Sequence, residues 1–103
     1  MWAQIIKTRV KPGTDQELML LMDQLKAAEQ PGSGLLRSSL MRDQKDPDLV
    51  YMMVVFDSEA KARAREDDPK REPGLQAARE TMAKIFEGSP DFIDLTVMAE
   101  ATF

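Results

Sequence analysis

The stretch that decides the fold is Leu49-Val50-Tyr51-Met52-Met53-Val54-Val55-Phe56, in which every residue is hydrophobic or aromatic. Successive side chains of a β-strand point to opposite faces of a sheet, so this strand presents apolar residues on both sides. In a chain of 103 residues, one layer of helices covers only one of these sides. The sequence therefore predicts that a second copy of the chain buries the other side, as a homodimer.

The segments around this strand alternate between strand and helix patterns. Apolar residues recur at steps of three and four after Thr14, and again over residues 74–87, as they do in amphipathic helices. A more polar helix is expected to begin at Asp57 or Ser58. The expected strands are residues 2–10, 35–42, 49–56 and 91–101. This β-α-β-β-α-β order is that of a ferredoxin-like α+β fold with an antiparallel sheet, and we expect one domain over residues 1–103.

Charge and hydropathy argue against nucleic acids and membranes as partners. The formal net charge is -4 and the pI is about 4.8, which disfavours binding to the phosphate backbone of nucleic acids. No apolar stretch approaches the roughly 20 residues that cross a bilayer, so we expect no membrane segment. The amino terminus lacks the pattern of a signal peptide, and a cytoplasmic protein is expected.

The chain contains no histidine and no cysteine. A serine or cysteine nucleophile activated by histidine is therefore impossible. Zinc, copper and haem sites that depend on imidazole or thiolate ligands are excluded as well. We expect neither a metal nor a cofactor, so any chemistry has to use aromatic, carboxylate, guanidinium and hydroxyl groups.

Aromatic and sulfur-containing side chains gather on the first and third strands. If these two strands pair in parallel, Trp2 comes close to Tyr51. Together with Met52, Met53 and Phe56, this pair would line a flat pocket for an aromatic ligand. The alternative is that these large side chains simply fill the core.

Three charged residues are candidates for polar roles at such a pocket. Arg37 would pair with an acidic ligand, or else lie at the surface or in an interface. Asp94 and Glu100 would serve as general bases if they were removed from water, or else they line an exposed or interfacial edge.

The chain resembles the antibiotic biosynthesis monooxygenase (ABM) superfamily of dimeric α/β-barrel proteins over nearly its whole length. The resemblance rests on Val10-Lys11-Pro12-Gly13, on Pro31-Gly32-Ser33-Gly34, and on Val54-Val55-Phe56 followed by Asp57-Ser58-Glu59-Ala60. It implies oxidation of aromatic phenols by molecular oxygen without metal or flavin. The haem-degrading branch uses Asn, Trp and His, whereas this chain lacks Asn and His. The cofactor-free branch uses Trp, Tyr, Arg and Asn in a pocket between the sheet and the helices. Trp2, Tyr51 and Arg37 are of the first three types, and the chain has no Asn.

Two functions are consistent with these observations. In a cofactor-independent monooxygenase acting on a phenol or quinol-like aromatic, Tyr51 or Asp94 would accept the proton, Arg37 would hold the anion and Trp2 would cover the ring. In the alternative, the chain is a non-catalytic dimer that binds a small hydrophobic ligand or serves in regulation or a stress response. The short inventory of polar groups favours this second function.

Overall fold

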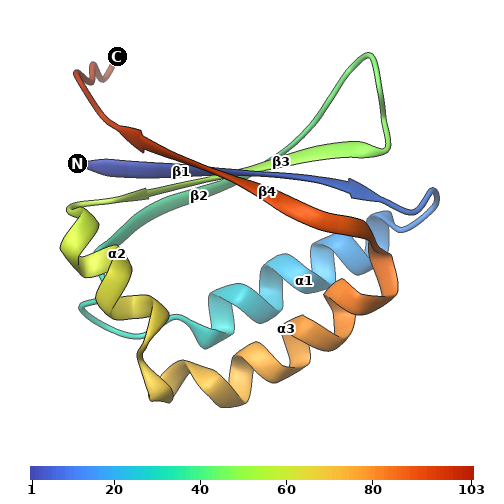
Figure 1. The fold of residues 1–103 in the computed structure, drawn as a ribbon, viewed down its shortest axis with the longest axis horizontal. Coiled ribbons are helices and arrows are strands. Elements are labelled where there is room, and N and C mark those ends of the chain that lie inside the picture. The colour runs from blue at the N-terminus through green and yellow to red at the C-terminus, as the bar shows by residue number, and fades with distance from the viewer.

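The computed structural model describes residues 1–103 and contains one sheet of four strands in the order β2-β3-β1-β4 (Figure 1). All three strand pairs are antiparallel. The two central strands are β1 and β3, which are the ones that this topology predicts. The strands are β1 (Trp2–Val10), β2 (Leu35–Arg42), β3 (Leu49–Phe56) and β4 (Phe86–Thr96). The ferredoxin-like α+β fold is thereby confirmed.

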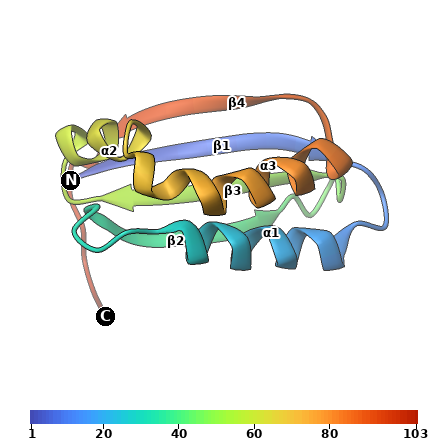
Figure 2. The same cartoon turned by 90° about the horizontal axis from the view of Figure 1, so that it is seen from below.

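All helices lie on one face of this sheet, which we call the helix face (Figures 1 and 2). The two long helices, α1 and α3, pack side by side beneath the strands. Their bounds are Asp15–Ala28 for α1 and Glu72–Ile85 for α3, and between β3 and α3 come α2 (Glu59–Glu66) and the short 3-10 helix η1 (Pro69–Arg71). The helices are too short or too polar to span a lipid bilayer.

The hydrophobic core fills the space between the helix face and the helices. It has two clusters, one toward the carboxyl-terminal end of β1 and one at its amino-terminal end. The first cluster contains Val10, Leu18, Leu21, Val50, Ala78 and Ile85, and the second contains Trp2, Val54, Phe56 and Ala62. Each fully buried large side chain stabilises the fold by about 1.5–3 kcal/mol relative to an exposed one.

The pairing of β1 with β3 differs from the prediction. The two strands are antiparallel, so Trp2 lies opposite Phe56 and Tyr51 lies opposite Lys7. The expected proximity of Trp2 and Tyr51 is therefore wrong. The cause is the chain path. The connection through α1 leaves β1 and β2 running in the same direction, and β3, which forms an antiparallel hairpin with β2, lies between them and is therefore antiparallel to both.

The last strand also differs from its predicted range of 91–101. It begins at Phe86, directly after α3, and ends at Thr96. Gly88 and Pro90 indicated a connecting loop, yet both lie inside the strand, where the β1–β4 register shifts between Lys7 and Arg9. An edge strand with a bulge tolerates proline, because an amide hydrogen at that position would have no hydrogen-bond acceptor on a neighbouring strand.

The other side of the sheet, which we call the open face, carries no helix (Figure 1). Ile93 and Leu95 of β4 point to this side and are 45% and 39% exposed, whereas Val55 of β3 is 2% exposed. The residues after Thr96 extend along this side, where the amide of Val97 donates to the carbonyl of Met1. Burial of the open face against a second copy stays a prediction.

Candidate functional site

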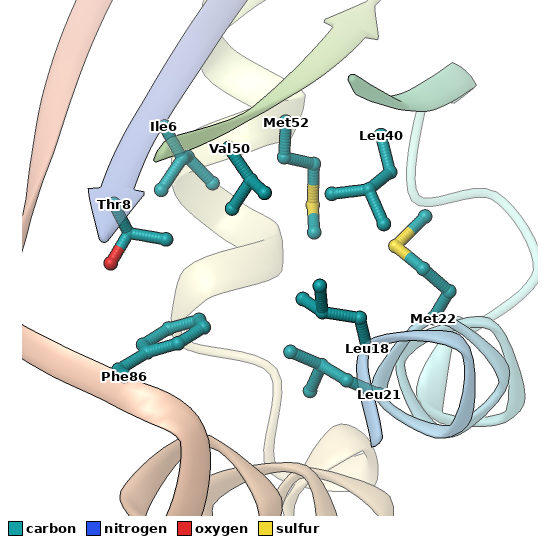
Figure 3. A pocket seen from close by; sticks show the side chains of 9 residues that line it. All are labelled: Ile6, Thr8, Leu18, Leu21, Met22, Leu40, Val50, Met52 and Phe86. Carbon is teal, nitrogen blue, oxygen red and sulfur yellow. The ribbon is translucent and has the colours of Figure 1, made fainter. Parts of the chain in front are cut away.

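A small cavity lies between helix α1 and the helix face of the sheet (Figure 3). Its volume is about 20 Å³. Eight of its nine lining residues are hydrophobic: Ile6, Leu18, Leu21, Met22, Leu40, Val50, Met52 and Phe86; the ninth is Thr8. Strands β1, β2 and β3, helix α1 and the start of β4 all contribute to one apolar space.

Strand alternation and register place these residues together. In the β1–β3 pair, Ile6 lies opposite Met52 and Thr8 lies opposite Val50, and all four side chains point to the helix face. The apolar stripe of α1 faces them, because residues three and four apart share one side of a helix. Phe86 closes the end of the space where α3 passes directly into β4.

The cavity has a closed side and a more accessible side. The closed side consists of residues that are 6% exposed or less: Thr8, Leu18, Leu21 and Val50. Five lining residues are partly exposed. Four of them, Ile6, Met22, Leu40 and Met52, form the accessible side, which we call the rim, and the fifth is Phe86 at the end of the space. Methionine side chains are unbranched and adapt easily to a guest, so the rim is the side from which a ligand would approach.

Thr8 carries the only side-chain polar atom among the lining residues. Its Oγ1 is buried and makes no hydrogen bond. A buried hydroxyl without a partner costs about 1–3 kcal/mol of stability. Thr81 of α3 is equally buried, but its hydroxyl donates to Gln24 Oε1 at 2.8 Å and lies 3.3 Å from the carbonyl of Ala77.

We predict opposite effects of the same substitution at these two threonines. Thr8→Val removes an unpartnered hydroxyl, so the free energy of unfolding should rise by about 1 kcal/mol. Thr81→Val breaks a hydrogen bond and leaves the Gln24 oxygen without its donor, so the free energy should fall by a similar amount. Urea denaturation of both variants measures the difference. Equal destabilisation of the two would show that the Thr8 hydroxyl has a partner in solution.

Three of the predicted site residues lie together at one end of the helix face, beyond the cavity. The rings of Trp2 and Phe56 are 5.9 Å apart, and the guanidinium of Arg63 lies 4.9 Å from the centre of the Trp2 ring. Asp94 accepts hydrogen bonds from Gln4 at 2.9 Å and from Arg63 at 2.8 Å. These bonds, that of Gln4 first, hold the pKa of Asp94 below its usual value, which weakens this carboxylate as a base.

The position of Arg63 gives a prediction for acid conditions. Because the folded-state pKa of Asp94 is lowered, its contribution to stability is complete above the unfolded-state value of about 3.9. The contribution is lost as the pH falls through the folded-state pKa. In Arg63→Gln the Asp94 carboxyl should titrate at a higher pH, which carbon-detected NMR measures. An unchanged midpoint would show that Arg63 does not influence this carboxylate.

The other three predicted site residues, Arg37, Tyr51 and Met53, lie on the open face. The Tyr51 hydroxyl donates to Asp43 at 3.2 Å, and burial, followed by this hydrogen bond, raises the pKa of the phenol. Arg37 forms an ion pair with Glu100 at 2.9 Å. Glu100, which was a candidate general base beside Asp94, is therefore bound to a guanidinium. The predicted pocket is thus divided between the two faces of the sheet, and the roles assigned to its members stay predictions.

None of these six residues lines the cavity, but Met52, which was also expected in the predicted pocket, does. The prediction of site residues from residue type selected aromatic and charged groups, whereas the cavity is lined by ordinary core residues. One signal was available in the sequence: Thr8 follows Ile6 and precedes Val10 on the same face of β1, as a polar residue in a row that is otherwise apolar around it.

Fold and cavity together define a ferredoxin-like α+β protein with a small apolar site between its sheet and its helices. The family model for the antibiotic biosynthesis monooxygenases matches residues 1–80. The chain therefore belongs to the antibiotic biosynthesis monooxygenase family. No curated protein matches its sequence.

Solved structures with the same fold are similar over almost the whole chain. A proposed antibiotic biosynthesis monooxygenase of Chloroflexus aurantiacus is 19% identical, with coverage of 98% of this chain and 96% of its own and a TM-score of 0.68. One from Nitrosomonas europaea is 13% identical, with coverage of 96% and 100% and a TM-score of 0.73. A variant of SnoaB, a cofactor-independent oxygenase from Streptomyces nogalater, is 15% identical, with coverage of 96% and 94% and a TM-score of 0.71. These likenesses define the fold.

Proposed function

We propose that the protein is a cofactor-independent monooxygenase that oxidises a small phenol or quinol-like aromatic with molecular oxygen. The observation that carries this proposal is the apolar cavity on the helix face, with its adaptable rim of partly exposed side chains. Membership of the monooxygenase family and the similarity to SnoaB support it. An aromatic ring would lie against the rim, where Met22 and Met52 change rotamer to admit it.

The reaction balances without a metal, a flavin or an external reductant. A phenol with a free ring position loses two hydrogens and gains one oxygen atom, which gives a quinone. The second atom of dioxygen leaves with these hydrogens as water. Ionised phenols are rich in electrons, so the protein has to bind and orient the ring and exclude water, not supply electrons.

The six site residues predicted from the sequence have different roles in this proposal, depending on the face of the sheet on which they lie. On the helix face, Trp2 and Phe56 would form an aromatic wall next to Asp94, which would accept the proton. Because the pKa of Asp94 is lowered, the substrate has to be a phenol that ionises easily. Tyr51, Arg37 and Met53 would act only on a ligand at the open face. The phenol of Tyr51 is protonated at neutral pH, and its hydroxyl donates to Asp43; its pKa is raised, so it does not act as a base there.

The alternative proposal is a non-catalytic protein that binds a small hydrophobic ligand in the same place. One observation favours it: none of the nine residues that line the cavity has a side chain that titrates. A binder would raise the midpoint of thermal unfolding with its ligand and leave that ligand unchanged.

Isotopic oxygen distinguishes the two functions. We expect incubation with a set of phenols and quinols under ¹⁸O₂ to give a quinone with one ¹⁸O atom, and mass spectrometry of the product detects it. Product formation without oxygen would refute the monooxygenase, and binding without any product would support the alternative.

A pair of variants on α1 locates the reaction. Met22→Trp fills the rim and should lower turnover by roughly an order of magnitude or more, because a displaced substrate reacts slowly. Met19→Trp is the matched control, since Met19 is 55% exposed and outside the cavity. Equal turnover in the two variants would place the reaction elsewhere.

We further propose that the protein is a homodimer that buries the open face. Ile93→Lys would place a charge in this interface, where removal from water costs several kcal/mol, and should shift the sedimentation of the protein towards a monomer. Phe92→Lys is the control. Phe92 immediately precedes Ile93 in β4, is 62% exposed and points to the helix face of the sheet. A monomeric unmodified protein at micromolar concentration would refute the dimer.

A further inference from the structure

The size of the cavity restricts what its closed side can hold. Its volume of about 20 Å³ is far below the roughly 150 Å³ of an engineered cavity that binds benzene. An aromatic ring therefore fits only if the rim opens, and even then the ring does not occupy the space between Thr8, Leu21 and Val50. This inner space suits a molecule of only two or three atoms.

The walls of this inner space favour an apolar guest over water. A buried water needs two to four polar partners, and the lining side chains offer only the hydroxyl of Thr8. Figure 3 shows that this hydroxyl lies toward Phe86, while the methyl group of Thr8 faces the other apolar side chains. Carbon and sulfur surround the remaining space. A water molecule there would lose most of its hydrogen bonds.

We propose that the inner part of the cavity is a binding site for molecular oxygen. Dioxygen is small and apolar and forms only weak hydrogen bonds, so it loses little when it leaves water for an apolar space. The proposal extends the monooxygenase function, on which it rests for its biological purpose. It assigns a separate place to each substrate, with dioxygen enclosed by α1, β1 and β3, and the aromatic ring at the rim.

The geometry brings the two substrates next to each other. The inner wall and the rim belong to the same cavity, since Val50 is on the closed side and Met52, two residues further along β3, is on the rim. A ring that lies against Met22 and Met52 would close the space behind it. Dioxygen would then be held against the face or edge of the ring with water excluded.

Dioxygen is paramagnetic, so its position can be measured directly on the protein without turnover. Under oxygen pressure, we expect the NMR relaxation of the Leu18, Leu21 and Val50 methyl groups to be enhanced several-fold more than that of Val54 and Ala62. Val54 and Ala62 are also buried, at 9% and 3% exposure, but they belong to the other core cluster and therefore report on non-specific access. Equal enhancement in the two clusters would overturn the proposal, and this comparison needs no variant.

A matched pair of variants connects the site to catalysis. Val50→Ile adds a methylene group to the cavity wall, whereas Val54→Ile adds the same group on the same face of β3 but in the other cluster. Val50→Ile should reduce the enhancement at Leu21 several-fold and raise the KM for oxygen several-fold, with the KM for the phenol unchanged. Val54→Ile should change neither quantity.

The outcomes separate this proposal from the proposed function. Selective relaxation enhancement without turnover of any phenol would uphold the oxygen site and refute the monooxygenase. Turnover without selective enhancement would overturn the oxygen site and leave the monooxygenase intact. A Val50→Ile protein whose KM for oxygen equals that of the unmodified protein would also overturn the proposal.

Discussion

The antiparallel register between β1 and β3 determines which side chains of this protein can act together. It sets Thr8 opposite Val50 and Ile6 opposite Met52, and it directs these four side chains to the helices. A shift by one residue would turn every side chain of one strand to the other face. The core, the cavity and the composition of the open face all follow from this single pairing.

The two faces of the sheet consequently have different chemistry. On the helix face, charged groups are confined to the ends of the sheet, where Arg42 meets Asp15 and Arg63 meets Asp94. On the open face, Arg37 and Tyr51 are held by Glu100 and Asp43 at the margin of an apolar surface. The guanidinium groups of Arg37, Arg42 and Arg63 are each paired with a carboxylate. The cation in the middle of the open face is Lys7 of β1, which lies opposite Tyr51. A ligand between the helix face and the helices would therefore be recognised mainly by its shape and by apolar contacts.

Much of the fold could be predicted from the sequence, because the decisive patterns are local. The bounds of β1, β2 and β3, and the helix that follows Thr14, agree with the alternation and spacing of apolar residues. The start of β4 could not be predicted, because Gly88 and Pro90 are typical of a loop and only the edge position permits them within a strand. The predicted ferredoxin-like topology already implies that β1 and β3 are antiparallel. The expected proximity of Trp2 and Tyr51 assumed parallel pairing instead, and for this reason it was wrong.

The candidate site was harder to predict than the fold, and the reason is chemical. Reasoning from residue type looks for groups that titrate, bind metals or attack, and it finds Tyr51, Asp94 and Arg37. A reaction whose electrons come from an ionised substrate needs none of these at the point where oxygen binds. It needs a dry space of the right size, and such a space is made from leucine, valine and methionine, which occur in every core. Only the packing of β1 and β3 on α1 distinguishes this space from the rest of the core, and the one sequence mark of it is Thr8, whose buried hydroxyl has no partner.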